Sequence, residues 1–216
     1  MARLQPGSTR DLAELIVGYG LILAVLWTPE PAQRILSPIA FTVTLAIVLA
    51  CGQTREELGF GLRGLVPSLW ILPAAAALTV GGVLICKRAG TLHALYDAGF
   101  GHVAGYFLWT IYQQFLLQDY FFPRMARVLA NEPQALFFVA VLFATAHLPN
   151  LVLTAATFVW GLISCVLFRR YRNLYAIGLA QGLLGLCFAV CVPDALNHHM
   201  RVGRGYLHYH ATRPSP

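Results

Sequence analysis

The chain has 216 residues, of which 58% are hydrophobic and 11% are charged, and its mean hydropathy is +0.65. Because soluble domains carry about 25% charged residues, this composition excludes a soluble globular protein, and its apolar content excludes a disordered one. The net charge of +6 comes from single residues and short clusters between apolar runs. This pattern argues against nucleic acid as a partner and is typical of residues that contact lipid headgroups.

Seven apolar segments are candidates for membrane-spanning helices, each of which needs about 20 largely apolar residues. They are residues 12–28, 35–51, 65–86, 101–122, 134–148, 150–168 and 174–192. The fifth is short and is followed by Pro149, so it is expected to form a tight pair or one kinked unit with the sixth. We therefore predict an all-α, polytopic transmembrane helical bundle of about seven spans, with six to eight as the range.

The whole chain, residues 1–216, is expected to form a single integral membrane domain with a polar tail, rich in His and Arg, at 193–216. With seven spans, the N-terminus shares one side with the loops near 52–64, 123–133 and 169–173. That side carries nine of the 15 Lys and Arg residues. The positive-inside rule then predicts a multi-pass protein of the cell (inner) membrane with a cytoplasmic N-terminus and membrane lipids as partners.

The fourth segment contains a stripe of polar residues. Thr110, Gln114 and Gln118 are spaced i, i+4, i+8 and share one helix face, with Gln113 beside it. Polar groups at membrane depth are costly, so this face is expected to point into the bundle, either as a functional site or as hydrogen-bonding contacts between helices. Asp119 is either a functional acid or an interfacial carboxylate paired with Arg124.

Two other segments contribute single polar residues. His147 ends the fifth segment, and Gln181 lies in the seventh beside Gly178 and Gly182, a GxxxG pair that predicts close helix packing. His147 is either a site residue or a core imidazole bonded to nearby backbone. We predict that Gln114, His147 and Gln181 line one buried polar cavity. Asp119 is expected outside it, near the membrane surface, with Arg124 or headgroup water as its partner.

Four stretches together resemble a known family. They are TREELGFGLR at 54–63, QQFLLQ at 113–118, FATAH at 143–147 and the hairpin FVWGLISCVLFRRYRNLYAIGLAQGLLG at 158–185. Their order and spacing are similar to those of the CAAX-protease and bacteriocin-processing (CPBP, Rce1-like) intramembrane endopeptidases. The resemblance covers a core of about residues 53–192 and implies a CAAX-protease-like helical fold.

The resemblance implies a water molecule activated by a Glu pair, with two His and one Asn that hold the water or stabilise the oxyanion. Gln113 and Gln114 stand at the Glu positions, Gln118 at the motif's Arg, Gln181 at the second His and Gly185 at the Asn; Phe143 and His147 match. A glutamine amide cannot accept a proton at useful pH, so it cannot act as a general base. A second alignment uses Asp119 as the acid and Arg124 as its Arg.

Three functions are compatible with these residues. The first is an endopeptidase for membrane-anchored or prenylated proteins, with Asp119 as base, His147 as polarising partner and Arg124 beside the acid. The second is a non-catalytic relative that binds a membrane helix or a lipid. The third is an enzyme acting on isoprenoids or other lipids, for which aromatic residues around the fourth segment would stabilise a cation and Asp119 would donate or accept the proton.

The sequence identifies no cofactor. The tail contains several potential metal ligands, but their spacing matches no standard zinc pattern, and we predict no metal site there. These residues are Asp194, His198, His199, His208 and His210.

Overall fold

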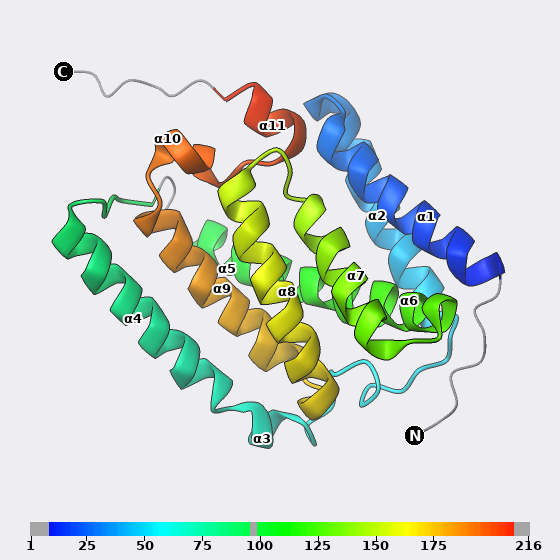
Figure 1. Ribbon diagram of the computed structural model, residues 1–216. Helices are drawn as coiled ribbons and strands as arrows, with labels where there is room; N and C mark the ends of the chain where they lie inside the picture. The colour runs from blue at the N-terminus through cyan, green and yellow to red at the C-terminus, as the bar shows by residue number, and fades with distance from the viewer. Residues whose placement is uncertain (1–8, 96–98, 210–216) are drawn as a thin grey trace.

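The computed structural model describes residues 9–95 and 99–209, and all regular secondary structure within these ranges is helical, as the composition predicts (Figure 1). The elements are α1 (Thr9–Trp27), α2 (Glu30–Leu49), α3 (Leu65–Ser68), α4 (Ile71–Ala89), α5 (Phe100–Phe115), the π-helix η1 (Leu116–Phe121), α6 (Phe122–Leu129), α7 (Glu132–Thr145), α8 (Leu151–Tyr171), α9 (Leu174–Cys191), α10 (Asp194–Asn197), the 3-10 turn η2 (His198–Met200) and α11 (Gly203–Leu207).

Each of the seven predicted segments is helical, and the chain is an integral membrane protein. Four helices in the described ranges are long and apolar enough to cross a membrane, namely α2, α3–α4 taken together, α8 and α9. Helices α1, α5 and α7 do not meet the length and composition of a membrane span. Helix α1 begins with Arg10, Asp11 and Glu14, and α7 has only 14 residues. Helix α5 has 16 residues before it continues into η1.

The helices run alternately between two ends of the bundle. At one end, the loop 50–64 contacts the α8–α9 turn, where the Leu174 amide donates to the Gly59 carbonyl (2.9 Å). At the other end, the Gly203 amide donates to the Leu148 carbonyl (2.8 Å). The N-terminal part of α1 therefore lies at the same end as the loop 50–64, and the α7–α8 connection lies with the C-terminal segment (Figure 1). If consecutive predicted segments run in opposite directions, the same loops are expected to lie together at each end of the bundle.

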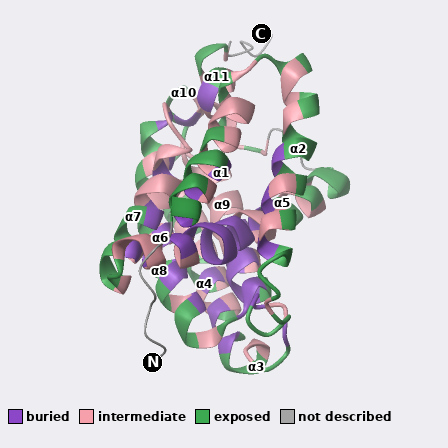
Figure 2. Ribbon diagram, turned by 90° about the vertical axis from the view of Figure 1, so that its right-hand side faces the viewer, coloured by how far each residue is buried: buried purple, intermediate pink, exposed green. Residues whose placement is uncertain are grey.

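Buried residues gather at the centre of the bundle, and exposed ones lie on its outer faces (Figure 2). All six residues of η1 are buried. The outer faces are apolar as well: Leu78, Val80 and Ile85 of α4 are more than half exposed. A helix that is apolar on both its inner and outer faces suits a lipid environment.

Helices α5 and α9 approach closely at small residues. A Cβ atom added at Gly178 would lie 2.6 Å from the Ile111 side chain, and one at Gly182 would lie 2.3 Å from Phe107. The predicted close packing at the GxxxG pair is confirmed by these contacts. It brings the polar face of α5 within hydrogen-bonding distance of Gln181.

This packing generates a stability prediction. Gly178→Ala should lower the free energy of unfolding by about 1–3 kcal/mol, because the new methyl group overlaps the Ile111 backbone and side chain. Gly105→Ala on α5 is the matched control, since nothing lies within 4 Å of a Cβ there. Thermal denaturation of the detergent-solubilised variants measures both. Equal melting temperatures for the two variants would contradict this account of the α5–α9 contact.

Candidate functional site

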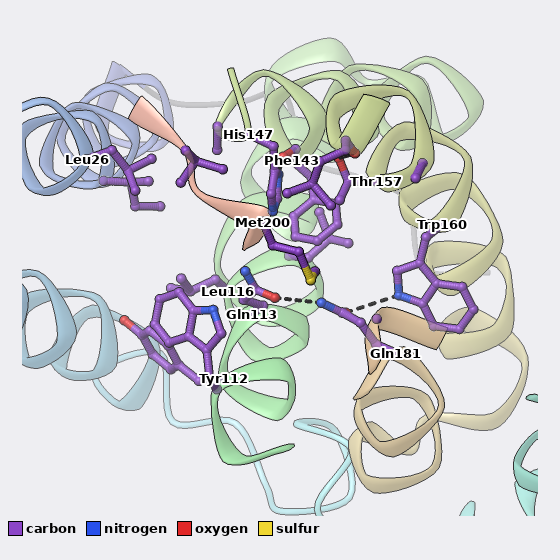
Figure 3. Close-up of a pocket in the computed structure, with 18 of the residues that line it drawn as sticks. Leu26, Tyr112, Gln113, Leu116, Phe143, His147, Thr157, Trp160, Gln181 and Met200 are labelled. Carbon is purple, nitrogen blue, oxygen red and sulfur yellow. Dashed lines mark hydrogen bonds between the residues drawn. The ribbon is translucent and has the colours of Figure 1, made fainter. Parts of the chain in front are cut away.

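A pocket of about 920 Å³ lies among α1, α5, α7, α8, α9 and the C-terminal segment. Most of its wall is apolar or aromatic, and Gln113, His147 and Gln181 bring polar groups to it (Figure 3). Three residues that are 30 or more positions apart in the sequence therefore meet at one cavity. The predicted Gln114 is the exception, because its neighbour Gln113 lines the pocket in its place.

The polar stripe of α5 is buried against its neighbours. Thr110 and Gln114 have no exposed surface and Gln118 is 1% exposed. Thr110 Oγ1 donates to the Gly178 carbonyl on α9 (2.8 Å), and Gln118 Nε2 lies 3.5 Å from Ser164 Oγ on α8. Gln114 belongs to this face, which packs on the neighbouring helices, whereas Gln113 is rotated about 100° from it and faces the pocket.

Four glutamine side chains form one chain of hydrogen bonds. Gln118 Nε2 donates to Gln114 Oε1 (3.1 Å), and Gln114 Nε2 donates to Gln181 Oε1 (2.6 Å). Gln181 Nε2 in turn donates to Gln113 Oε1 (2.6 Å), and its own oxygen also accepts from Trp160 Nε1 (3.1 Å; Figure 3). The chain ends at Gln113 Nε2, a donor for which no acceptor occurs among the described residues. Gln113 therefore offers N–H groups to the pocket.

His147 is held by its own helix. Its Nδ1 lies 2.7 Å from the Phe143 carbonyl, and the two rings pack edge to face. A carbonyl only accepts, so Nδ1 carries the proton and Nε2 is the acceptor of the neutral ring. The i, i+4 spacing of Phe143 and His147 places both side chains at the pocket.

The prediction for Asp119 is right about the cavity and wrong about the surface. The residue lies outside the pocket wall, as predicted. The expected interfacial carboxylate with Arg124 or headgroup water as its partner is not observed, because the Asp119 side chain is 1% exposed and neither carboxyl oxygen has a hydrogen-bond partner among the described residues. The cause is η1, since a π-helix changes the rotation per residue from the α-helical value on which the prediction relied.

Arg124 has a different partner from the one predicted. Its Nε donates to Glu14 of α1 (2.6 Å), and its guanidinium lies 4.3 Å from the centroid of the Tyr120 ring. Toward Asp119 it contacts only the backbone carbonyl (3.3 Å). Arg127 makes the equivalent ion pair with Asp11 (2.6 Å).

Sequence reasoning missed these two ion pairs, although a signal was present. Asp11 and Glu14 are spaced i, i+3, and so are Arg124 and Arg127. Two acids and two bases at the same helical spacing can pair when their helices are antiparallel, as α1 and α6 do here. The pairs fix α1 against α6 and thereby place Tyr19 and Leu26 of α1 at the pocket.

The C-terminal segment also contributes to the pocket, through His199, Met200 and Val202. The sequence indicated only a polar tail here. The predicted ligand candidate His210 lies outside the described residues. Within residues 9–95 and 99–209, no group of three or more His, Cys, Asp or Glu side chains is arranged to hold a metal ion.

The side chains that line the pocket determine which reactions and which ligands it can support. Among the described residues that line it there is no carboxylate, no lysine and no arginine. Its titratable side chains are imidazoles and phenols. Amide and indole groups can donate hydrogen bonds to a carbonyl oxygen, but an amide cannot take a proton from water. The arrangement therefore suits binding of a carbonyl group more than activation of a water molecule.

Comparison with known protein families matches residues 19–187 to the family described as type II CAAX prenyl endopeptidase Rce1-like. Because this match covers most of the chain, the protein belongs to the Rce1-like family. No curated protein and no solved structure matches the chain.

The buried ion pair generates a prediction. Glu14→Gln should lower the free energy of unfolding by about 3 kcal/mol, because it leaves the Arg124 guanidinium buried without a counter-charge. Glu30→Gln removes the partner of Arg34 from an exposed pair of the same type and should leave the stability unchanged. Thermal denaturation in detergent compares the two. A Glu14→Gln protein as stable as Glu30→Gln would show that Arg124 does not depend on this carboxylate.

Proposed function

We propose that this Rce1-like protein is a non-hydrolytic member of its family that binds an apolar chain carrying a carbonyl group, taken from the membrane. The observation that carries the proposal is the amide chain from Gln118 to Gln113. By the resemblance, two of its members, Gln113 and Gln114, stand where the family motif has acids, and the chain ends in free N–H donors at the pocket. A donor that has no protein acceptor at membrane depth gains most from a ligand carbonyl.

The pocket wall supports an apolar ligand that enters from the lipid phase. Val159 and Ile163 of α8 line the pocket, yet they are 56% and 46% exposed on the outer face of the bundle. Trp109 of α5 likewise lines the pocket and is half exposed. The cavity therefore reaches the lipid-facing surface, and its volume lies within the range of ligand sites. A membrane-anchored peptide and a lipid ester both have the required chemistry.

Hydrolysis receives less support. The family description refers to prenyl endopeptidases, and such chemistry needs a base beside the scissile carbonyl. Asp119, the acid of the second alignment, is absent from the pocket wall, and Gln113 and Gln114 cannot replace it. His147 has one acceptor nitrogen, but it has no carboxylate to orient it, because its Nδ1 proton is bonded to a backbone carbonyl.

The isoprenoid-enzyme hypothesis has partial support. Tyr106, Trp109 and Tyr112 line the pocket, and such aromatic faces can stabilise a cation. The acid assigned to that chemistry, Asp119, does not reach the same cavity. An aromatic wall without a carboxylic acid among its described residues fits retention of an apolar chain better than its conversion.

Photo-crosslinking tests ligand binding directly. A photoreactive residue at Leu116, which lines the pocket, should capture one discrete adduct in native membranes. The control is Leu78 of α4, which is 66% exposed on the outer face and should give only a mixture that follows the composition of the bilayer. Mass spectrometry identifies the adduct as peptide or lipid. The same mixed adducts at both positions would contradict the proposal.

A cleavage assay tests the absence of hydrolysis. The purified protein, incubated with membrane-tethered and prenylated peptides, should release no fragment, because the pocket has no carboxylate to act as the base or to orient His147 for that role. His147→Ala and Asp119→Asn should give the same result. Cleavage by the natural sequence that is lost in either variant would refute the proposal and identify that side chain as catalytic.

A further inference from the structure

The C-terminal segment 194–209, here called the strap, folds back over one end of the bundle (Figure 1). Gly203 lies against Leu26 of α1 and donates its amide to the Leu148 carbonyl in the α7–α8 connection, and His199, Met200 and Val202 line the pocket. Within the strap, Met200 reaches into the cavity on the side of Gln113 and Gln181 (Figure 3). A side chain from the end of the chain thus occupies space beside the free donors of the proposed site.

Asn150 attaches the strap to the bundle. Its Nδ2 group donates to the Asn197 carbonyl (2.8 Å), to Asn197 Oδ1 (3.2 Å) and to the Arg201 carbonyl (3.3 Å). Its Oδ1 separately accepts from the Leu153 amide at the start of α8 (3.1 Å). One buried side chain therefore has two functions on two different atoms: the nitrogen holds the strap and the oxygen caps a helix.

The part of the strap that carries Met200 has a strained backbone. His198, His199 and Met200 have φ values of +47°, +52° and +58°, a conformation that L-residues avoid because of clashes with their own Cβ atoms. Contacts on both sides hold this turn. The His198 ring stacks on Tyr206 with centroids 4.1 Å apart, and the His199 amide donates to Asp194 (2.9 Å). Three such residues in succession persist only where the surroundings impose them.

Methionine suits the position that it occupies. Its side chain is unbranched and flexible, so it fills an irregular apolar space without a fixed fit and leaves it readily. It brings no acceptor strong enough to satisfy the N–H groups of Gln113. Met200 therefore fills apolar space in the pocket, but it leaves the N–H groups of Gln113 without an acceptor among the described residues.

We propose that the strap is a displaceable occupant of the pocket, in which Met200 takes the place of the apolar group of the ligand beside Gln113 and Gln181. This inference rests on the proposed function for the identity of the ligand, an apolar chain with a carbonyl group. With the strap in place the cavity still measures about 920 Å³, so withdrawal of Met200 enlarges the space beside Gln113 and Gln181 rather than creating it. Release of the strained turn at residues 198–200 offsets part of the cost of breaking the Asn150 hydrogen bonds.

The first experiment tests the attachment. Asn150→Asp keeps an oxygen for the α8 cap but sets a carboxylate against the three oxygens of the strap, so the strap should detach. Asn173→Asp is the matched control, because Asn173 is an equally buried N-cap whose Nδ2 binds the Gly61 carbonyl at the other end of the bundle. Trypsin cleavage after Arg201 and Arg204 should be about tenfold faster in Asn150→Asp and unchanged in Asn173→Asp, since cleavage follows the open population.

The second experiment tests whether Met200 takes the place of a ligand in the pocket. Palmitic acid carrying a diazirine serves as the probe, and labelling of α9 at the pocket is mapped by mass spectrometry. Asn150→Asp and Met200→Ala should both raise this labelling several-fold. Met200→Ala should do so without faster trypsin cleavage, and Met200→Leu should label as the natural protein does. Gly203→Ala provides a second way to detach the strap, because its Cβ atom would lie 2.3 Å from the Leu26 carbonyl oxygen.

The outcomes separate the two proposals. Unchanged trypsin cleavage in both Asn150→Asp and Gly203→Ala, or unchanged labelling in Met200→Ala, would overturn the strap proposal. The crosslinking at Leu116 in the natural protein would still decide whether the pocket binds a ligand. Faster cleavage and stronger labelling in these variants would support the strap as a displaceable occupant.

Discussion

The hydrogen bond between Gln114 and Gln181 is the interaction on which the site depends, because it joins the two helices that build it. It forms only where α5 and α9 are close, and glycines on α9 allow this approach. Inside a membrane an amide has no water to bond with, so each glutamine must find another polar group in the protein. The result is a chain of amides in which a change at Gln118 affects the donors that Gln113 presents to the pocket.

A charged side chain inside the membrane needs a polar partner even more than a neutral polar side chain does. Arg124 is almost fully buried and has the Glu14 carboxylate, two backbone carbonyls and an aromatic face as partners. Asp119, five residues earlier, is equally buried and has none among the described residues. A buried polar group without a partner is costly, so Asp119 is an unfavourable feature of the packed core. The ion pairs of Arg124 and Arg127 instead join α6 to α1.

The fold and the polar face of α5 were predictable because both depend on local periodicity. The i, i+4, i+8 spacing of Thr110, Gln114 and Gln118 defines one face of an α-helix, and the structure buries that face. Asp119 was misplaced because a π-helix has no comparable sequence signature. The partner of Arg124 is 110 residues away, and Met200 reaches the pocket from the opposite end of the chain. Such contacts depend on tertiary packing, which a single sequence does not encode in any fixed spacing.

The resemblance places amides at positions where the family motif has acids, and this difference decides which chemistry those positions can support. A glutamate at position 113 would be a half-buried carboxylate at the wall of an apolar cavity, whereas Gln113 carries no charge and satisfies its oxygen through Gln181. The amide therefore removes both the base and the electrostatic cost of keeping a base. What remains is a donor facing an apolar cavity that opens toward lipid. Under the proposed function, such a site would hold a carbonyl group without attacking it, and Met200 would compete with the ligand for the space beside Gln113.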